Sequence, residues 1–143
     1  MSIENNKAVA HQMLDEVFNQ GNMSLADELL SPNYIEHEEL PPGVPAGREG
    51  LKQTILMTRA AFPDFSATIE DIVAEGDKVA QRITWTGTHK GDFMGIPATG
   101  KSVSIQVLDI IRVVDGHLVE HWGLMDSMGL MQQLDVMPAP GEG

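Results

Sequence analysis

After Pro63 the apolar residues of this chain change their spacing from about every 3.6 residues to every second residue, and no other feature constrains the fold as much. Helical spacing predicts helices at residues 10–18, 24–30, 51–62 and 127–134. Alternation predicts strands at residues 66–75, 78–89, 102–114 and 117–125, with a brief strand at 33–37 before them. Helices that precede most of the strands are typical of an α+β fold.

Turn signals join the predicted strands into two hairpins. Gly76-Asp77 separates the first pair of strands, and Asp115-Gly116 separates the second pair. Because such short loops connect antiparallel strands, the sheet is expected to be mainly antiparallel. Gly87 and Gly123 allow long strands to bend sharply. We therefore predict a cone-shaped, strongly bent sheet with helices packed on its concave side, enclosing one pocket.

Length and composition limit the classes of function. A chain of 143 residues has the size of one domain, here 1–143, with a flexible tail from about 136 to 143. The absence of cysteine excludes disulfides and thiolate nucleophiles, so histidine and carboxylate must carry any reactivity. A formal charge of −12 disfavours nucleic acid and membrane surfaces as partners. A start without a basic or apolar run favours the cytoplasm.

Residues Gly95 to Ser102 match the P-loop pattern of nucleotide-binding proteins letter for letter. A P-loop requires a helix after it, whose N-terminus holds the phosphates. Here Val103, Ile105 and Val107 alternate as in a strand, and Pro97 removes one of the amides that would bind phosphate. We therefore interpret the segment as a connection between strands and expect no nucleotide partner.

The histidines show no close metal-binding spacing. His37, His89 and His121 fall on separate predicted strands, so they could meet at a metal only through the fold. The working prediction is that the chain uses no metal and no cofactor.

The hairpin at 102–125 carries the most informative pattern. A two-residue loop at Asp115-Gly116 places Asp109 opposite Trp122, and alternation then puts Asp109, Glu120, Trp122 and Asp126 on one face, with His121 on the other. That face is otherwise apolar, and carboxylates in apolar surroundings are often functional. The alternative is a solvent-exposed edge or an ion pair with Arg112 or Arg82. We predict catalytic roles for Asp126 and Asp109, and substrate contacts for Trp122, Glu120 and His121.

Further candidates come from other strands. Trp85 and His89 share one face of the strand at 78–89 and are expected to line the pocket, although a buried tryptophan more often serves packing. His37 ends the first short strand, at what would be the mouth of the cone, and is the third predicted catalytic residue.

Several phrases of the sequence resemble the SnoaL-like polyketide cyclase family of the nuclear-transport-factor-2-like superfamily. They are Gly87-Thr88-His89, the segment from Gly91 to Lys101, Arg112, Asp115-Gly116, Glu120-His121-Trp122, Asp126 and Gln133-Leu134. The resemblance implies a cone-shaped α+β fold, a metal-free intramolecular aldol closure of a polyketide ester, and a homodimer. It also implies that Asp126 is the general acid/base and that His37 lies in the pocket.

The sequence leaves other functions of this fold open. The first hypothesis is a cyclase or isomerase that acts on a small hydrophobic carbonyl compound. Alternatives are a non-catalytic binder of a hydrophobic metabolite and an enzyme that activates water against an epoxide. A homodimer is also predicted from the residues, because the strands at 102–125 are apolar on both faces and one face needs a cover.

Overall fold

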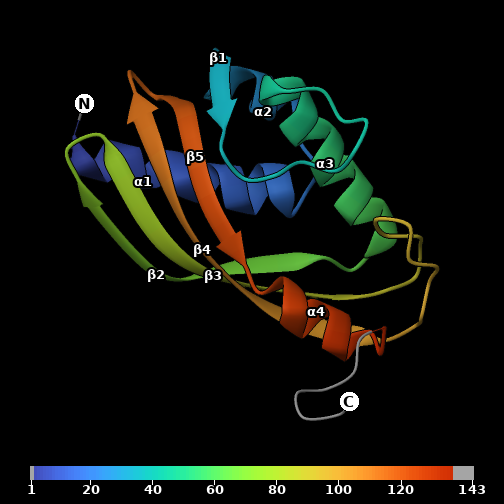
Figure 1. The fold of residues 1–143 in the computed structure, drawn as a ribbon. Helices are drawn as coiled ribbons and strands as arrows, with labels where there is room; N and C mark the ends of the chain where they lie inside the picture. Colours follow the sequence, from blue (N-terminus) through green and yellow to red (C-terminus); the bar gives the residue numbers. More distant parts are fainter. Residues whose placement is uncertain (1, 137–143) are drawn as a thin grey trace.

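The computed structural model describes residues 2–136 and has the predicted α+β architecture (Figure 1). In chain order the elements are α1 (Ile3–Gln12), a π-helical segment (Met13–Phe18), α2 (Met23–Leu29), β1 (Leu30–Glu36), α3 (Gly47–Ala61), β2 (Ser66–Glu75), β3 (Lys78–Thr88), β4 (Ser102–Val114), β5 (His117–Met125) and α4 (Ser127–Gln133). The tail predicted from about residue 136 lies almost entirely outside the described residues. No helix among them is long and apolar enough to span a bilayer.

The first helix buries the face that its sequence spacing predicts. Ser2 caps α1 by accepting a hydrogen bond from the Asn5 amide at 3.0 Å. The π-helical segment continues the helix through Phe18, and Ala10, Met13 and Val17 lie in the core. The predicted first helix is therefore present and ends at Phe18 as expected, but it begins at Ile3, and its last part is π-helical.

The five strands form one sheet in the order β1-β5-β4-β3-β2. Only β1 runs parallel to its neighbour, so the prediction of a mainly antiparallel sheet is confirmed. The sheet is strongly curved but not closed, and α1 and α3 lie against its concave side (Figure 1). Two clusters of buried side chains fill the space between the sheet and the helices, one around Val17 and Ile111 and one around Phe62 and Ile105.

The turn at Asp115-Gly116 has the predicted position, with positive φ angles of 51° and 79° at its two residues. The ladder beyond it shifts by one residue, because Arg112 pairs with Glu120 whereas Val113 pairs with Leu118. Val119 is therefore the extra residue of a β-bulge. Every residue of β5 after Val119 faces the side opposite to the one that simple alternation predicts.

The segment that matches a P-loop connects β3 to β4. Ser102, its last residue, begins β4, so a strand follows the motif, as predicted. Phe93 and Ile96 form an isolated antiparallel bridge within this connection. The helix N-terminus that a phosphate-binding P-loop needs is therefore not present at this position.

Candidate active site

Polar residues of four strands and one loop gather on the inner face of the sheet. Along β1, alternation turns the side chain of Tyr34 inward, and Glu36 and the following Glu38 share that side. The cluster, which we call the inner cluster, consists of Tyr34, Glu36, Glu38, Gln81, Asp109 and His121. Its members are largely shielded from solvent, and side chains of this kind are rarely buried without a structural partner or a function.

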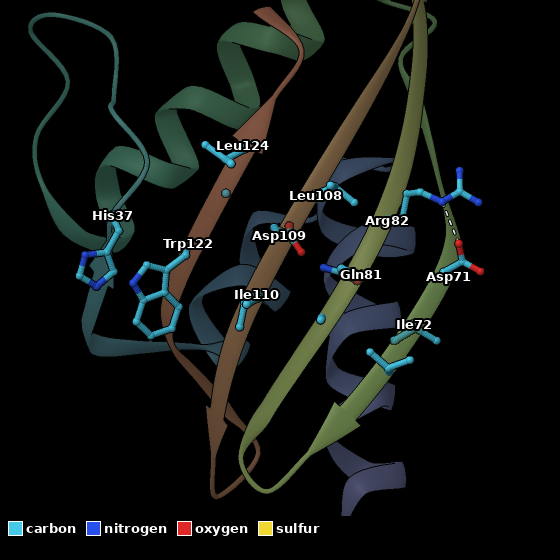
Figure 2. A pocket seen from close by; sticks show the side chains of 13 residues that line it. His37, Asp71, Ile72, Gln81, Arg82, Leu108, Asp109, Ile110, Trp122 and Leu124 are labelled. Atoms are coloured by element: carbon cyan, nitrogen blue, oxygen red, sulfur yellow. Dashed lines mark hydrogen bonds and ion pairs between the residues drawn. The ribbon is translucent and has the colours of Figure 1, made fainter.

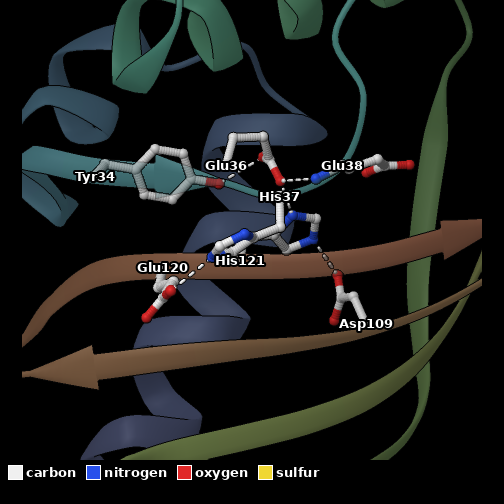
Figure 3. A network of polar contacts seen from close by, with 7 residues as sticks. All are labelled: Tyr34, Glu36, His37, Glu38, Asp109, Glu120 and His121. Atoms are coloured by element: carbon white, nitrogen blue, oxygen red, sulfur yellow. Dashed lines mark hydrogen bonds and ion pairs between the residues drawn. The ribbon is translucent and has the colours of Figure 1, made fainter.

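His121 lies between two carboxylates at the centre of the inner cluster (Figure 3). Its Nδ1 atom is 2.5 Å from Glu36 Oε2, and its Nε2 atom is 3.2 Å from Asp109 Oδ2. The side chains of Glu36 and Asp109 expose only 3% and 8% of their surfaces. The parallel pairing of Glu36 with His121 and the β4–β5 ladder hold the three side chains together.

The two carboxylates keep His121 charged. Burial disfavours the imidazolium, but hydrogen bonds to Asp109 and Glu36 and their negative charges outweigh it and raise the pKa of His121 to about 10. Tyr34 donates a hydrogen bond to Glu36 Oε1 at 2.7 Å. Burial, together with the charge of Glu36, raises the pKa of Tyr34 well above its usual range. Tyr34 is therefore a neutral donor that fixes Glu36.

Asp109 retains one free oxygen. Its Oδ2 atom binds His121, whereas its buried Oδ1 atom has no hydrogen-bond partner in residues 2–136. Gln81, which pairs with Asp109 across β3 and β4, has an equally unpartnered Oε1 atom in the same part of the chain. Two buried acceptors without donors are costly unless a ligand or water supplies the missing hydrogen bonds. This part of the inner cluster is thus suited to receive a proton or a donor group.

The inner cluster also contains the set of side chains that comes nearest to a metal site. Glu36, Glu38 and His121 each offer one ligand atom, and these atoms lie within 4.8 Å of one another. A cation there would have to replace the hydrogen bond between His121 Nδ1 and Glu36. The three histidines considered from the sequence do not meet, because His37 lies on the outer face and His89 in the second core cluster.

Three of the predicted site residues lie together on the opposite, outer face of the sheet. The rings of His37 and Trp122 stack with their centroids 4.8 Å apart. His37 Nε2 is 2.6 Å from Glu120 Oε2, and Arg112 donates to Glu120 Oε1 at 2.9 Å. These two hydrogen bonds lower the pKa of Glu120. The ion-pair alternative that the sequence offered for this face is correct for Glu120.

The predicted grouping of Asp109 with Glu120 and Trp122 is wrong. Asp109 pairs with Gly123, and Trp122 pairs with Ile110. The bulge at Val119 is the physical cause, since it exchanges the faces of all later residues of β5. His121, which alternation placed on the other side, consequently joins Asp109. His37 points outward because it follows the inward Glu36 on β1.

The outer face carries a groove of about 650 Å³ (Figure 2). Its exposed apolar side chains come from neighbouring strands and include Leu108, Ile110 and Leu124, which are 59%, 42% and 79% exposed. His37 and Trp122 stand at one side of the groove, and the ion pair between Arg82 and Asp71 stands at the other. This groove therefore lies outside the cone, whereas the sequence predicted a pocket inside it.

Trp85 and His89 face inward, as their shared parity predicts, but they lie in the core. Trp85 contacts Phe62 edge to face at 5.2 Å and is 5% exposed, so the packing alternative is correct. His89 is fully buried, accepts a hydrogen bond from the Thr99 amide at 3.3 Å, and stacks on Phe62. Trp85 belongs to the core cluster around Phe62 and Ile105, and His89 packs against that cluster through Phe62. Neither residue makes a hydrogen bond to the inner cluster.

Asp126 does not point into a pocket. It is the N-cap of α4, is exposed, and accepts a hydrogen bond from the Gly129 amide at 2.9 Å. The expected position is wrong because β5 ends at Met125 and the chain turns there into the helix. Aspartate is a preferred N-cap residue, so the capping of α4 is a sufficient reason for an aspartate at this position, and no catalytic role is needed to explain it.

Sequence reasoning missed Tyr34, Glu36, Glu38 and Gln81. The signal for the first three was available in the alternation of residues 34, 36 and 38 along a short strand whose Tyr34 is buried. Gln81 shares the inward face of its strand with Trp85, but a single glutamine does not indicate a site until its neighbour across the ladder is known.

Comparison with solved structures gives the class of protein that this fold defines. The structure of TsrD from Streptomyces laurentii superposes with a TM-score of 0.86, at 32% identity, over 96% of this chain and 99% of that one. Two curated relatives are similar in sequence. The nogalonic acid methyl ester cyclase of Streptomyces nogalater is 29% identical over 82% of this chain and 88% of its own length. The aklanonic acid methyl ester cyclase DnrD of Streptomyces peucetius is 32% identical over 79% of this chain and 77% of its own length.

The family model for SnoaL-like polyketide cyclases matches residues 8–134. This chain therefore belongs to the SnoaL-like polyketide cyclase family, and the resemblance noted from its sequence is confirmed.

Proposed function

We propose that this protein closes a ring in a polyketide-like ester by intramolecular aldol addition, and that Asp109 is its general base. The observation that carries the proposal is the state of the Asp109 carboxylate. One of its oxygens is bound to His121, and the other is buried and has no hydrogen-bond partner among residues 2–136. A carboxylate fixed in this way can accept a proton without first breaking a hydrogen bond.

The chemistry requires one proton to leave carbon and one to reach oxygen. Asp109 Oδ1 removes a proton from the carbon next to a carbonyl group, and the electrons of that bond form an enolate. The enolate carbon attacks a second carbonyl within the same molecule, a carbon–carbon bond forms, and the new alkoxide takes up a proton. His121 remains charged between Asp109 and Glu36 and offsets one of their two negative charges.

The substrate class is inferred from the relatives. Two of them are named as cyclases of nogalonic acid methyl ester and aklanonic acid methyl ester. We propose a related polyketide ester for this chain. The free oxygens of Asp109 and Gln81 favour a ligand that brings hydrogen-bond donors to this place.

The test is ring closure of these two methyl esters, followed by chromatography of the product. We expect Asp109→Asn to lower kcat by about a hundred- to ten-thousand-fold, the usual range for the loss of an acid/base group. The matched control is Asp126→Asn, which removes a carboxylate outside the inner cluster and should keep full activity. Failure of the wild-type protein to close either ester, or full activity of Asp109→Asn, would refute the proposal.

Two further measurements, binding of the esters and turnover of an epoxide, separate the alternative functions. Tight binding of the esters without turnover would support a binder of hydrophobic metabolites. Conversion of an epoxide into a diol, with loss of activity in Asp109→Asn, would support activation of water. We expect neither outcome, because the curated relatives are named as cyclases.

We further propose that the protein is a cytoplasmic homodimer whose interface is the outer face of the sheet. Leu108, Ile110 and Leu124 expose apolar surface there. Two ion pairs also lie on this face, Arg82 with Asp71 and Arg112 with Glu120. Charges that are paired within one copy repel a second copy less, which favours self-association even though the chain carries a net charge of −12.

A further inference from the structure

We propose that Glu38 is a second catalytic residue of this site and donates the proton that converts the alkoxide of the new ring into a hydroxyl group. The inference rests on the proposed function, because it assigns the partner of Asp109 in the same reaction. No local pattern in the sequence indicates a role for Glu38, because its place depends on the pairing of β1 with β5.

The position of Glu38 is fixed by the backbone. Its amide donates to Glu36 Oε2 at 3.1 Å, directly after β1 ends. One of its carboxylate oxygens lies within 4.8 Å of both Glu36 and His121. The Oε2 atom is also 3.1 Å from the place where a Cβ atom on Gly123 would lie. Gly123 is the residue that pairs with Asp109, so Glu38 faces the same space over the sheet as the proposed base.

The carboxyl group of Glu38 has the surroundings of a proton donor. In residues 2–136 it makes no ion pair, and no hydrogen bond to another side chain holds it. It is half-buried and lies near Glu36, Asp109 and the charged His121. Burial raises its pKa, and the two carboxylates add to this effect, against the opposing influence of His121. Two carboxyl groups in one site with different surroundings are a common basis for separate acid and base roles.

The proton count closes over one cycle. Asp109 gains the proton that leaves the substrate carbon, and Glu38 loses a proton to the alkoxide. The product is an isomer of the substrate, so no oxidant, reductant or co-reactant is required. Asp109 then releases its proton and Glu38 regains one by exchange with solvent, which reaches the half-buried Glu38.

The experiment compares Glu38→Gln with Glu39→Gln in the full-length protein. Glu39 is the exposed neighbour and undergoes the same chemical change. With aklanonic acid methyl ester as substrate, we expect Glu38→Gln to lower kcat about a hundredfold or more and to leave KM within about threefold, because only the proton transfer is removed. Glu39→Gln should match the wild-type protein, and Glu38→Asp should recover part of the lost rate.

The pH profile supplies a second readout that a structural role would not produce. A donor must be protonated, so the wild-type rate should fall on the alkaline side as Glu38 loses its proton, and Glu38→Gln should lack this limb. The charged groups that act on Glu38 are Glu36, Asp109 and His121. If Glu38→Gln keeps its rate and its alkaline limb while Asp109→Asn is inactive, the role of Glu38 is refuted and the proposed function stands. If the wild-type protein closes no ring, the proposed function itself fails.

Discussion

The Nε2 atom of His121 lies 3.2 Å from Oδ2 of Asp109, so a positive charge on β5 is held against a negative charge on β4 inside the sheet's concave face. With Glu36 on the other side of the ring, the three groups form a buried row whose net charge is one negative unit when all are ionised. Removing one member of such a row leaves its partners buried without compensation.

Stability should depend on pH through His121. Its pKa rises from the ordinary 6.5 to about 10 on folding, so its contribution is fully present below about pH 6.5 and disappears as the pH rises toward 10. Urea unfolding between pH 6 and 10 measures this as a declining free energy of unfolding. His121→Gln should lower that free energy by about 3–5 kcal/mol near neutral pH. The difference between the two proteins should shrink toward pH 10, and a constant difference would contradict the charged row.

Gly123→Ala should damage the site although it adds only one methyl group. The new Cβ atom would lie 2.7 Å from His121 Cε1 and 3.1 Å from Glu38 Oε2, so the imidazole ring must move away from Asp109. We expect about 1–3 kcal/mol of lost stability, as for other overpacked positions, and a clear loss of ring-closing activity. The control is the same change in a His121→Gln background, where the methyl group meets less resistance and the cost in stability should fall.

Asp126→Ala should affect stability and leave the reaction alone. The Asp126 side chain satisfies the Gly129 amide at the start of α4, and loss of an N-cap typically costs about 1 kcal/mol. Asp126→Ser, which retains a capping oxygen, should be close to the wild-type protein in urea unfolding. A large fall in kcat with Asp126→Ala would restore the catalytic role that its position in the sequence suggested.

Leu124→Glu should separate the proposed dimer. Leu124 is 79% exposed on the apolar outer face, opposite Leu108 in the β4–β5 ladder, and a carboxylate there would be buried without a partner in the dimer. Light scattering coupled to size exclusion should give the mass of a dimer for the wild-type protein and of a monomer for the variant. The matched control is Leu56→Glu on α3, where 49% of the leucine is exposed outside this face. A wild-type monomer at every concentration would exclude the dimer.

Much of the fold could be predicted from local patterns. The bounds of β4 and β5 and the turn between them follow from alternation and from Asp115-Gly116, and the structure has them at the same residues. The family was likewise predictable, because several of its short motifs occur in this chain. The strand bounds, the turn and each of these motifs depend on residues that are close together in the sequence.

The site was less predictable because it depends on register and on pairing over long distances. Val119 carries no sign in the sequence that it is the bulged residue, yet it decides whether His121 or Trp122 faces inward. The contact between Glu36 and His121 joins residues 85 positions apart across the single parallel pair of strands. Alternation within one hairpin does not report such a contact.

The bulge at Val119 also bears on how far a functional assignment can be transferred between relatives. A hairpin that lacks this residue would send the imidazole to solvent and the indole into the cone, with its composition almost unchanged. Relatives that differ by a single insertion before this point can therefore keep the same letters in the same order and still present different groups to a substrate. An alignment column alone therefore does not show which side of the sheet a residue of β5 faces, and the strand pairing has to be known as well.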